Sequence, residues 1–179
     1  MTAPAQATDR LPSAPAASPG RTTAGERLAG YIYGTIVALA VIVGGARAYP
    51  HGAGHIAALV TVTAGALWLA HVYAHALGHS VGHDEHLSFG ELRYIARREA
   101  SIVEAAVLPV AALLLGSIGL ISTRGAVWLA FGLGLGVLAA QGVRFARVER
   151  MGLAGTLFVV GANISFGFLL VVVKLVLTH

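Results

Sequence analysis

The sequence predicts an all-α integral membrane protein that crosses the bilayer five times, and the first reason is composition. Of its 179 residues, 56% are hydrophobic and only 11% are charged, whereas soluble domains have about 25% charged residues. So few charged side chains cannot cover the water-facing surface of a soluble domain. The apolar residues also fall into five runs of about 20 residues, the length with which a helix crosses about 30 Å of hydrocarbon. None of these runs alternates with a period of two, so a β-barrel is excluded.

Residues 1–26 precede the first apolar run and differ from the rest in composition. They hold four of the six prolines, together with many Ala, Ser and Thr residues. Such a segment cannot bury enough apolar surface to offset the entropy lost on ordering. We therefore expect a disordered cytoplasmic tail, and since the segment has no apolar core of its own, it is not a cleaved signal peptide.

The apolar runs predict a bundle of five helices over residues 27–179, because lipid cannot satisfy the hydrogen-bonding groups of irregular backbone. With the N-terminus inside the cell, nine of the twelve basic residues flank the inner ends of the runs, which predicts an N-in, C-out orientation. Eleven of the twelve are arginine and alanine is abundant, a bias that indicates a GC-rich bacterium and its cytoplasmic membrane. The predicted spans are residues 28–47, 53–76, 101–121, 125–146 and 153–176.

The segment between the second and third spans, residues 77–100, is predicted to be a cytoplasmic, histidine-rich loop. Ser88 and Glu91 have the spacing of a capping box, which marks the start of a helix. We expect this helix to begin near Phe89 and to run without a break into the third span. Its basic and apolar residues lie on different sides, as in an amphipathic helix at the inner membrane surface.

Pairs of small residues at a spacing of four occur in four of the spans and predict close helix packing. Where lipid supplies no hydrophobic driving force, small residues allow the close backbone approach that stabilises helix association. We expect the bundle to be a homo-oligomer. The residues with this predicted packing role are Gly30 and Gly34, Ala112 and Gly116, Gly132 and Gly136, and Gly161 and Ser165.

Histidines are concentrated at the end of the second span, with five of the eight between positions 71 and 86. His71, His75, His79 and His83 are spaced four residues apart, so on a helix they form one stripe. Neighbouring imidazoles in such a stripe can bind one metal ion, or they can pass protons, because imidazole titrates near neutral pH. A third interpretation is that neutral histidines satisfy polar groups near the interface. An ionisable residue within the membrane, such as His71, is a functional candidate because it is costly to place there.

A carboxylate at the inner end of the third span is the predicted partner of this stripe. Glu104 lies deeper than Glu99 and has no basic residue nearby on its own helix face, whereas Glu99 is expected to pair with Arg97 or Arg98. Carboxylate together with imidazole suits Zn, Fe or Mn as the bound ion. The absence of cysteine excludes a thiolate site.

These residues predict a membrane protein that handles a cation, by binding or permeation of a divalent metal or of protons. Two alternatives remain open: a non-catalytic interaction subunit that docks a partner through the inner loop, and a haem-bearing electron carrier with two histidines from different helices. We expect no enzymatic activity, since the chain has no phosphate-cradling loop, nucleophile elbow, HExxH motif or hydrolytic triad. We also expect no nucleic-acid partner, because the basic residues are sparse and lie at the ends of the apolar runs.

Four short stretches resemble a family of small actinobacterial multi-pass membrane proteins, and this resemblance implies no activity. They are residues 26–28 (ERL), 33–39 (YGTIVAL), 71–74 (HVYA) and 96–99 (ARRE). The predicted topology is also similar to that of the vacuolar iron and manganese transporters, which have five spans and a metal-binding cytoplasmic segment between spans two and three. Here that segment is short and carries histidines in place of a carboxylate-rich insert, and the first span lacks an acidic residue. The resemblance therefore implies no site residues for this chain.

Overall fold

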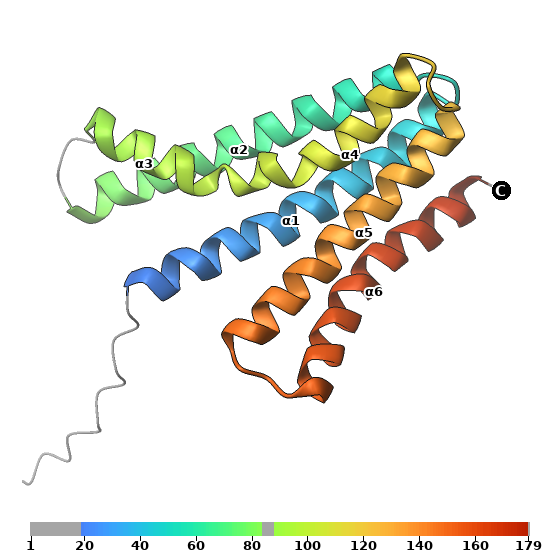
Figure 1. Ribbon diagram of the computed structural model, residues 1–179. Coiled ribbons are helices and arrows are strands. Elements are labelled where there is room, and N and C mark those ends of the chain that lie inside the picture. Colours follow the sequence, from blue (N-terminus) through green and yellow to red (C-terminus); the bar gives the residue numbers. More distant parts are fainter. Residues whose placement is uncertain (1–18, 84–87, 179) are drawn as a thin grey trace, which may run out of the picture.

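The computed structural model describes residues 19–83 and 88–178, and all regular structure in these residues is helical. Six helices follow one another along the chain (Figure 1). The prediction of an all-α protein is confirmed. The helices are α1 (Pro19–Ala48), α2 (Ala53–His83), α3 (Phe89–Glu99), α4 (Ser101–Ser117), α5 (Thr123–Val148) and α6 (Leu153–Thr178).

Three of these helices are long and apolar enough to cross a membrane by themselves. The stretches concerned are Gly25–Ala48, Ala53–Gly78 and Thr123–Val148, of 24, 26 and 26 residues. Together, α3 and α4 form a fourth candidate in two pieces, and the apolar stretch Leu153–Leu169 of α6 is shorter. The protein thus has three to four candidate spans among its described residues, and the count of five stays a prediction.

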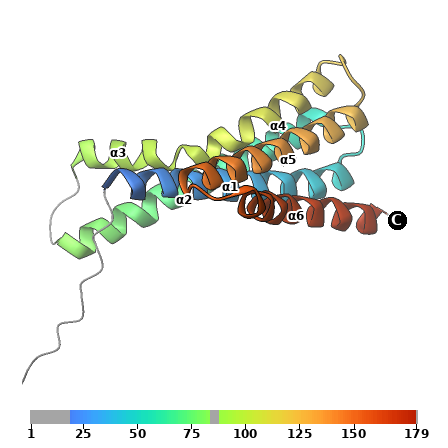
Figure 2. The same cartoon turned by 60° about the horizontal axis from the view of Figure 1, so that its bottom comes forward.

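The helix that leads into the third span begins as expected but is not continuous. Ser88 caps α3: its hydroxyl accepts a hydrogen bond from the Glu91 amide, and the Glu91 carboxylate accepts one from the Ser88 amide. The prediction of an unbroken helix is wrong, because α3 and α4 meet at an angle of 44° (Figure 2). At the junction the Ala100 amide donates a hydrogen bond to the Arg97 carbonyl, with an N···O distance of 3.4 Å. This bond connects residues three positions apart, so the chain turns more tightly there than in an α-helix, whose bonds connect residues four positions apart.

Two of the predicted helix boundaries also differ from the observed ones. Residues 19–26, which composition assigns to the disordered tail, are the first residues of α1, and Pro19 is tolerated there because the first turn of a helix leaves its amides unbonded. Residues 77–83, predicted as loop, continue α2 to His83. Residues 1–18 and 84–87 lie outside the described part of the chain.

The core lies between α1, α2, α4 and α5. Helix α1 contacts every other helix, and α6 packs on the outside against α5 and α1 (Figure 1). Large apolar side chains on the outside, such as Phe158 and Leu153, are exposed, as expected for surfaces that face lipid. The largest fully buried apolar side chains of the core are Phe131, Leu39, Ile42, Ile56, Leu113 and Leu138.

The small residues predicted to pack fall into two groups. A Cβ atom added to Gly34 would lie 2.6 Å from the Ile102 carbonyl oxygen, and one added to Gly116 would lie 2.5 Å from the Ala126 Cβ, so α4 approaches α1 and α5 closely at these glycines. Gly30 faces Ser101 in the same way, and Ala112 is fully buried in the core.

Gly132, Gly136 and Gly161 point into open space, with no described atom within 4 Å of an added Cβ. Ser165 is exposed, and its hydroxyl bonds to the Ala162 carbonyl of its own helix. The packing role predicted for these four residues is therefore not seen within the chain, because their faces of α5 and α6 point outward.

Candidate functional site

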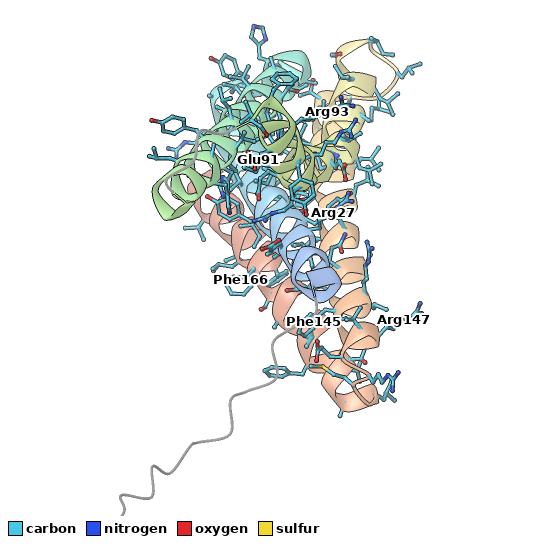
Figure 3. All side chains as sticks on the ribbon, turned by 90° about the vertical axis from the view of Figure 1, so that its left-hand side faces the viewer. Arg27, Glu91, Arg93, Phe145, Arg147 and Phe166 are labelled. Atoms are coloured by element: carbon cyan, nitrogen blue, oxygen red, sulfur yellow. The ribbon has the colours of Figure 1, made fainter. Side chains whose placement is uncertain are left out.

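Charged side chains from four helices meet at one end of the bundle, where α1 begins and α2 ends; Figure 3 looks onto this end. We call this group the charged cluster. It consists of two sets of ion pairs that are joined through neighbouring residues of α1. Its members are Glu26 and Arg27 of α1, His75 of α2, Arg98 and Glu99 of α3, and Glu104 of α4.

The first set is built around Glu99, whose side chain is only 10% exposed. Arg98 Nε lies 3.4 Å from Glu99 Oε1 and 3.2 Å from Glu26 Oε2. His75 Nδ1 lies 3.7 Å from the same oxygen of Glu99. Because the carboxylate is shielded from water, these charges interact more strongly than pairs on the surface do. The expected pairing of Glu99 with Arg98 is confirmed, and His75 and Glu26 are additional partners.

The second set is built around Glu104, at the start of α4. Arg27 Nη2 lies 3.4 Å from Glu104 Oε2, and the Tyr31 hydroxyl donates a hydrogen bond to the same oxygen. Both partners belong to α1. Sequence reasoning missed them because it compared Glu104 only with basic residues of its own helix and with the histidines of the second span.

The rings of His71 and His75 both turn back toward their own helix. In each, Nδ1 lies 3.0 Å from the carbonyl oxygen four residues earlier, that of Leu67 and that of His71 respectively. A carbonyl oxygen can only accept, so these contacts place a hydrogen on Nδ1 and leave the Nε2 lone pair available. His71 also lies against Tyr33, with ring centroids 5.6 Å apart.

The described part of the chain contains no group of three or more His, Asp or Glu residues able to hold a metal ion. His75 is joined to Glu99, whereas Glu104 is joined to Arg27 and Tyr31. The structure thus does not bring Glu104 together with His71 and His75, the two described histidines of the stripe, as one ligand set. The side chains of His79 and His83 lie outside the description, so their predicted role stays a prediction.

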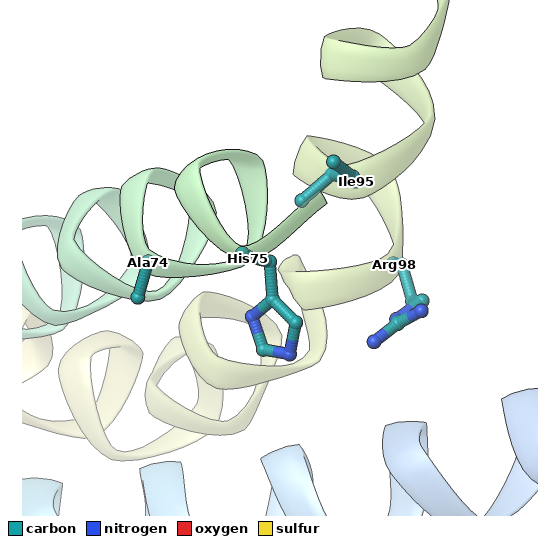
Figure 4. Close-up of a pocket in the computed structure, with 5 residues that line it drawn as sticks. Ala74, His75, Ile95 and Arg98 are labelled. Atoms are coloured by element: carbon teal, nitrogen blue, oxygen red, sulfur yellow. The ribbon is translucent and has the colours of Figure 1, made fainter. Parts of the chain in front are cut away.

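A pocket of about 380 Å³ opens between α2 and α3 beside the charged cluster. His75 and Arg98 point into the same space from the two helices (Figure 4). His75 is 43% exposed, so water reaches its ring. Next to the pocket, the Trp68 indole donates a hydrogen bond to the Ala96 carbonyl at 2.9 Å and ties α2 to α3. Ala74, Gly78 and Ile95 complete the described lining.

Beyond the charged cluster the described interior of the bundle is largely apolar. The Thr35 hydroxyl is satisfied by the Tyr31 carbonyl at 2.7 Å. Ser101 Oγ and Gln141 Oε1 are buried and have no hydrogen-bond partner among the described atoms. These isolated groups do not form a continuous polar path from the cluster to the other end of the bundle.

The chain matches no protein-family model, no curated protein and no solved structure. The two family resemblances therefore stay predictions, and the function has to be argued from the charged cluster itself.

Proposed function

We propose that the protein binds a proton at the membrane, and that His75 and Glu99 are the groups that hold it. The observation that carries this proposal is the contact between an imidazole that water can reach and a buried carboxylate. This proposal narrows the predicted function, the handling of a metal cation or of protons, to the binding of a proton.

The charges of the cluster support this proposal. Three carboxylates, those of Glu26, Glu99 and Glu104, face the two guanidinium groups of Arg27 and Arg98. Three negative charges therefore face two positive ones, and Glu99, the buried carboxylate of the three, shares Arg98 with Glu26. An imidazole that takes up a proton becomes positively charged, so protonation of His75 supplies the third positive charge of the cluster.

The geometry of His75 favours Nε2 as the atom that receives the proton. Since Nδ1 already donates to the His71 carbonyl, the added proton goes to Nε2. The resulting imidazolium is stabilised by Glu99, 3.7 Å from Nδ1. A divalent metal ion would bring two positive charges next to the guanidinium of Arg98, whereas protonation of His75 adds only one, so like-charge repulsion disfavours the metal more.

We propose further that all five predicted helices, α6 included, span a bacterial cytoplasmic membrane with the N-terminus inside. Twenty helical residues cover about 30 Å, so counting from Ala48 back along α1 and from Ala53 forward along α2 puts the inner boundary near residues 28 and 73. Arg27 and His75 then lie at this boundary, open to the cytoplasm. The apolar core beyond the cluster favours binding over permeation, and a haem would need opposed histidines, whereas the described helices carry theirs on α2 alone.

Trp68 provides a test, because its indole joins α2 to α3 beside the cluster. In a Trp128→Phe background, in which Trp68 is the single tryptophan, fluorescence is recorded in lipid nanodiscs from pH 8 to pH 5. We expect the fluorescence of Trp68 to change over this pH range, and we expect this change to be absent in His75→Gln and in Glu99→Gln. His55→Gln is the matched control, since His55 is also on α2 but stacks on Tyr49 at the other end of the bundle. A transition that survives in His75→Gln would refute the proposal.

Two further measurements separate the proton from the other cations and binding from permeation. After incubation with Zn, Fe or Mn, elemental analysis should find no metal whose amount depends on His75. A pH-sensitive dye inside proteoliposomes should report the same slow proton leak for the unaltered protein and for His75→Gln. A leak that is lost in the variant would instead support permeation through the bundle.

A further inference from the structure

Helix α3 presents an exposed face that no other described element covers. Phe89, Arg93 and Arg97 follow at intervals of four and so lie on one stripe of the helix. Phe89 is 82% exposed, and Tyr94, beside Arg93 on the same side, is 58% exposed. The opposite face carries the two buried residues of α3: Ile95, which lines the pocket between α2 and α3, and Glu99 of the charged cluster.

The two arginines of this face differ from those of the charged cluster, because they are not neutralised. Arg27 and Arg98 contact carboxylates, whereas Arg93 and Arg97 form no ion pair with any residue that the structure describes. The acidic residues of α3 are already engaged: Glu91 caps the helix through Ser88, and Glu99 is buried among its partners. Among the described residues, the face therefore carries two positive charges without an ion-pair partner, beside two aromatic rings.

The place of α3 along the fourth candidate span indicates what lies against this face. Gly30 lies two residues inside the boundary proposed for α1 and faces Ser101 of α4, so the hydrocarbon boundary meets the third predicted span near the start of α4. The headgroup layer extends roughly 5–7 Å beyond that boundary, and the 44° bend between α3 and α4 shortens the rise of α3 along the direction of α4. Arg97 and Arg93 then lie at the level of the phosphates.

We infer that α3 is a binding surface for the anionic phospholipid headgroups of the inner leaflet. A guanidinium group binds a phosphate with two parallel hydrogen bonds, and Phe89 and Tyr94 suit the interfacial layer in which aromatic side chains collect. The inference rests on the proposed topology and is independent of proton binding at His75.

Electron paramagnetic resonance with spin-labelled phosphatidylglycerol and phosphatidylcholine tests this inference on the full chain in bilayers. We expect the protein to select the anionic lipid, and Arg93→Gln/Arg97→Gln to reduce this selectivity about 5–30-fold, since each basic residue near the surface contributes a factor of about five. Arg93→Lys/Arg97→Lys keeps the charge but loses the paired hydrogen bonds of the guanidinium groups, so its selectivity should lie between that of the unaltered protein and that of Arg93→Gln/Arg97→Gln.

The matched control is Arg144→Gln/Arg147→Gln, which removes two exposed arginines of α5 that the topology puts at the same leaflet. Selectivity that falls equally in both double variants would overturn the inference, because bulk charge would then explain it. Selectivity unchanged in Arg93→Gln/Arg97→Gln would also overturn it and would favour an acidic protein partner for this face. Circular dichroism checks that each variant is folded.

The topology is tested separately, because the chain has no cysteine. Gly90→Cys, on the exposed side of α3, should react with a membrane-impermeant maleimide only after the cells are opened. Labelling of intact cells would overturn the assignment to the inner leaflet, while the Trp68 measurement would still decide proton binding.

Discussion

Replacing glycine by alanine at Gly34 and at Gly136 tests how closely the helices of the bundle have to pack. An added Cβ at Gly34 would lie 2.6 Å from the Ile102 carbonyl oxygen and 3.0 Å from its Cα. Since C···O contacts settle at about 3.3–3.6 Å, α1 and α4 have to separate by roughly 0.8 Å. The obstacle is backbone, so no side-chain rotation relieves it. At Gly136 nothing lies within 4 Å.

Comparing Gly34→Ala with Gly136→Ala isolates the steric cost, because the higher helix propensity of alanine stabilises both variants by the same amount, about 0.5–1 kcal/mol. Overpacking costs about 1–3 kcal/mol, and we expect Gly34→Ala to be less stable than Gly136→Ala by an amount in that range. Equilibrium unfolding in mixed micelles, followed by circular dichroism, measures the difference. Equal free energies of unfolding for the two variants would refute the close α1–α4 contact, and a loss confined to Gly136→Ala would show that the open face of α5 is an interface between copies.

Three further predictions concern the core, a helix cap and an exposed ion pair. Phe131→Ala should lower the free energy of unfolding by about 3–5 kcal/mol, because Phe131 is 1% exposed, whereas Phe158→Ala, at a position that is 77% exposed, should lower it far less; denaturant titration compares them. Ser88→Ala should cost about 1 kcal/mol and speed amide exchange in the first turn of α3 only, so exchange that is unchanged would count against the cap. For Arg27 and Glu104, both about half exposed, a double-mutant cycle should give a coupling below about 1 kcal/mol that weakens in salt.

Local patterns in the sequence predicted local features well. The capping box at Ser88 was correct because it depends on residues only three positions apart. The bend at Ala100 was not predicted, because nothing in the local sequence breaks the helix there. The contacts at the bend are tertiary: Glu99 is buried beside His75, and Ser101 lies against Gly30 of α1.

The pairs of small residues also show that local sequence patterns do not predict tertiary contacts. Gly30 with Gly34 and Gly132 with Gly136 have identical spacing, yet only the first pair faces another helix of the chain. Spacing shows that two residues share one helix face. Which way that face points depends on how the helices cross, and one sequence does not contain that information in readable form.

The candidate site was predicted in part for a related reason. The histidine stripe lies at the end of α2 that contributes to the charged cluster, and His75 does contact a carboxylate. The carboxylate is Glu99, however, because Glu104 is held by Arg27 and Tyr31 of α1. Predicting that outcome requires the α1–α4 crossing.

The close packing of α1 on α4 and the charged cluster are two consequences of one contact. Gly30 and Gly34 let α1 approach Ser101 and Ile102 so closely that a methyl group has no room. Arg27 and Tyr31 alternate with these glycines along α1, and the close approach brings them within reach of Glu104 at the start of α4. With Glu104 neutralised from α1, Glu99 has only Arg98 to share with Glu26. In the proposed function, His75 supplies the remaining positive charge. The protonation that we propose for His75 therefore depends on the absence of a side chain at Gly34.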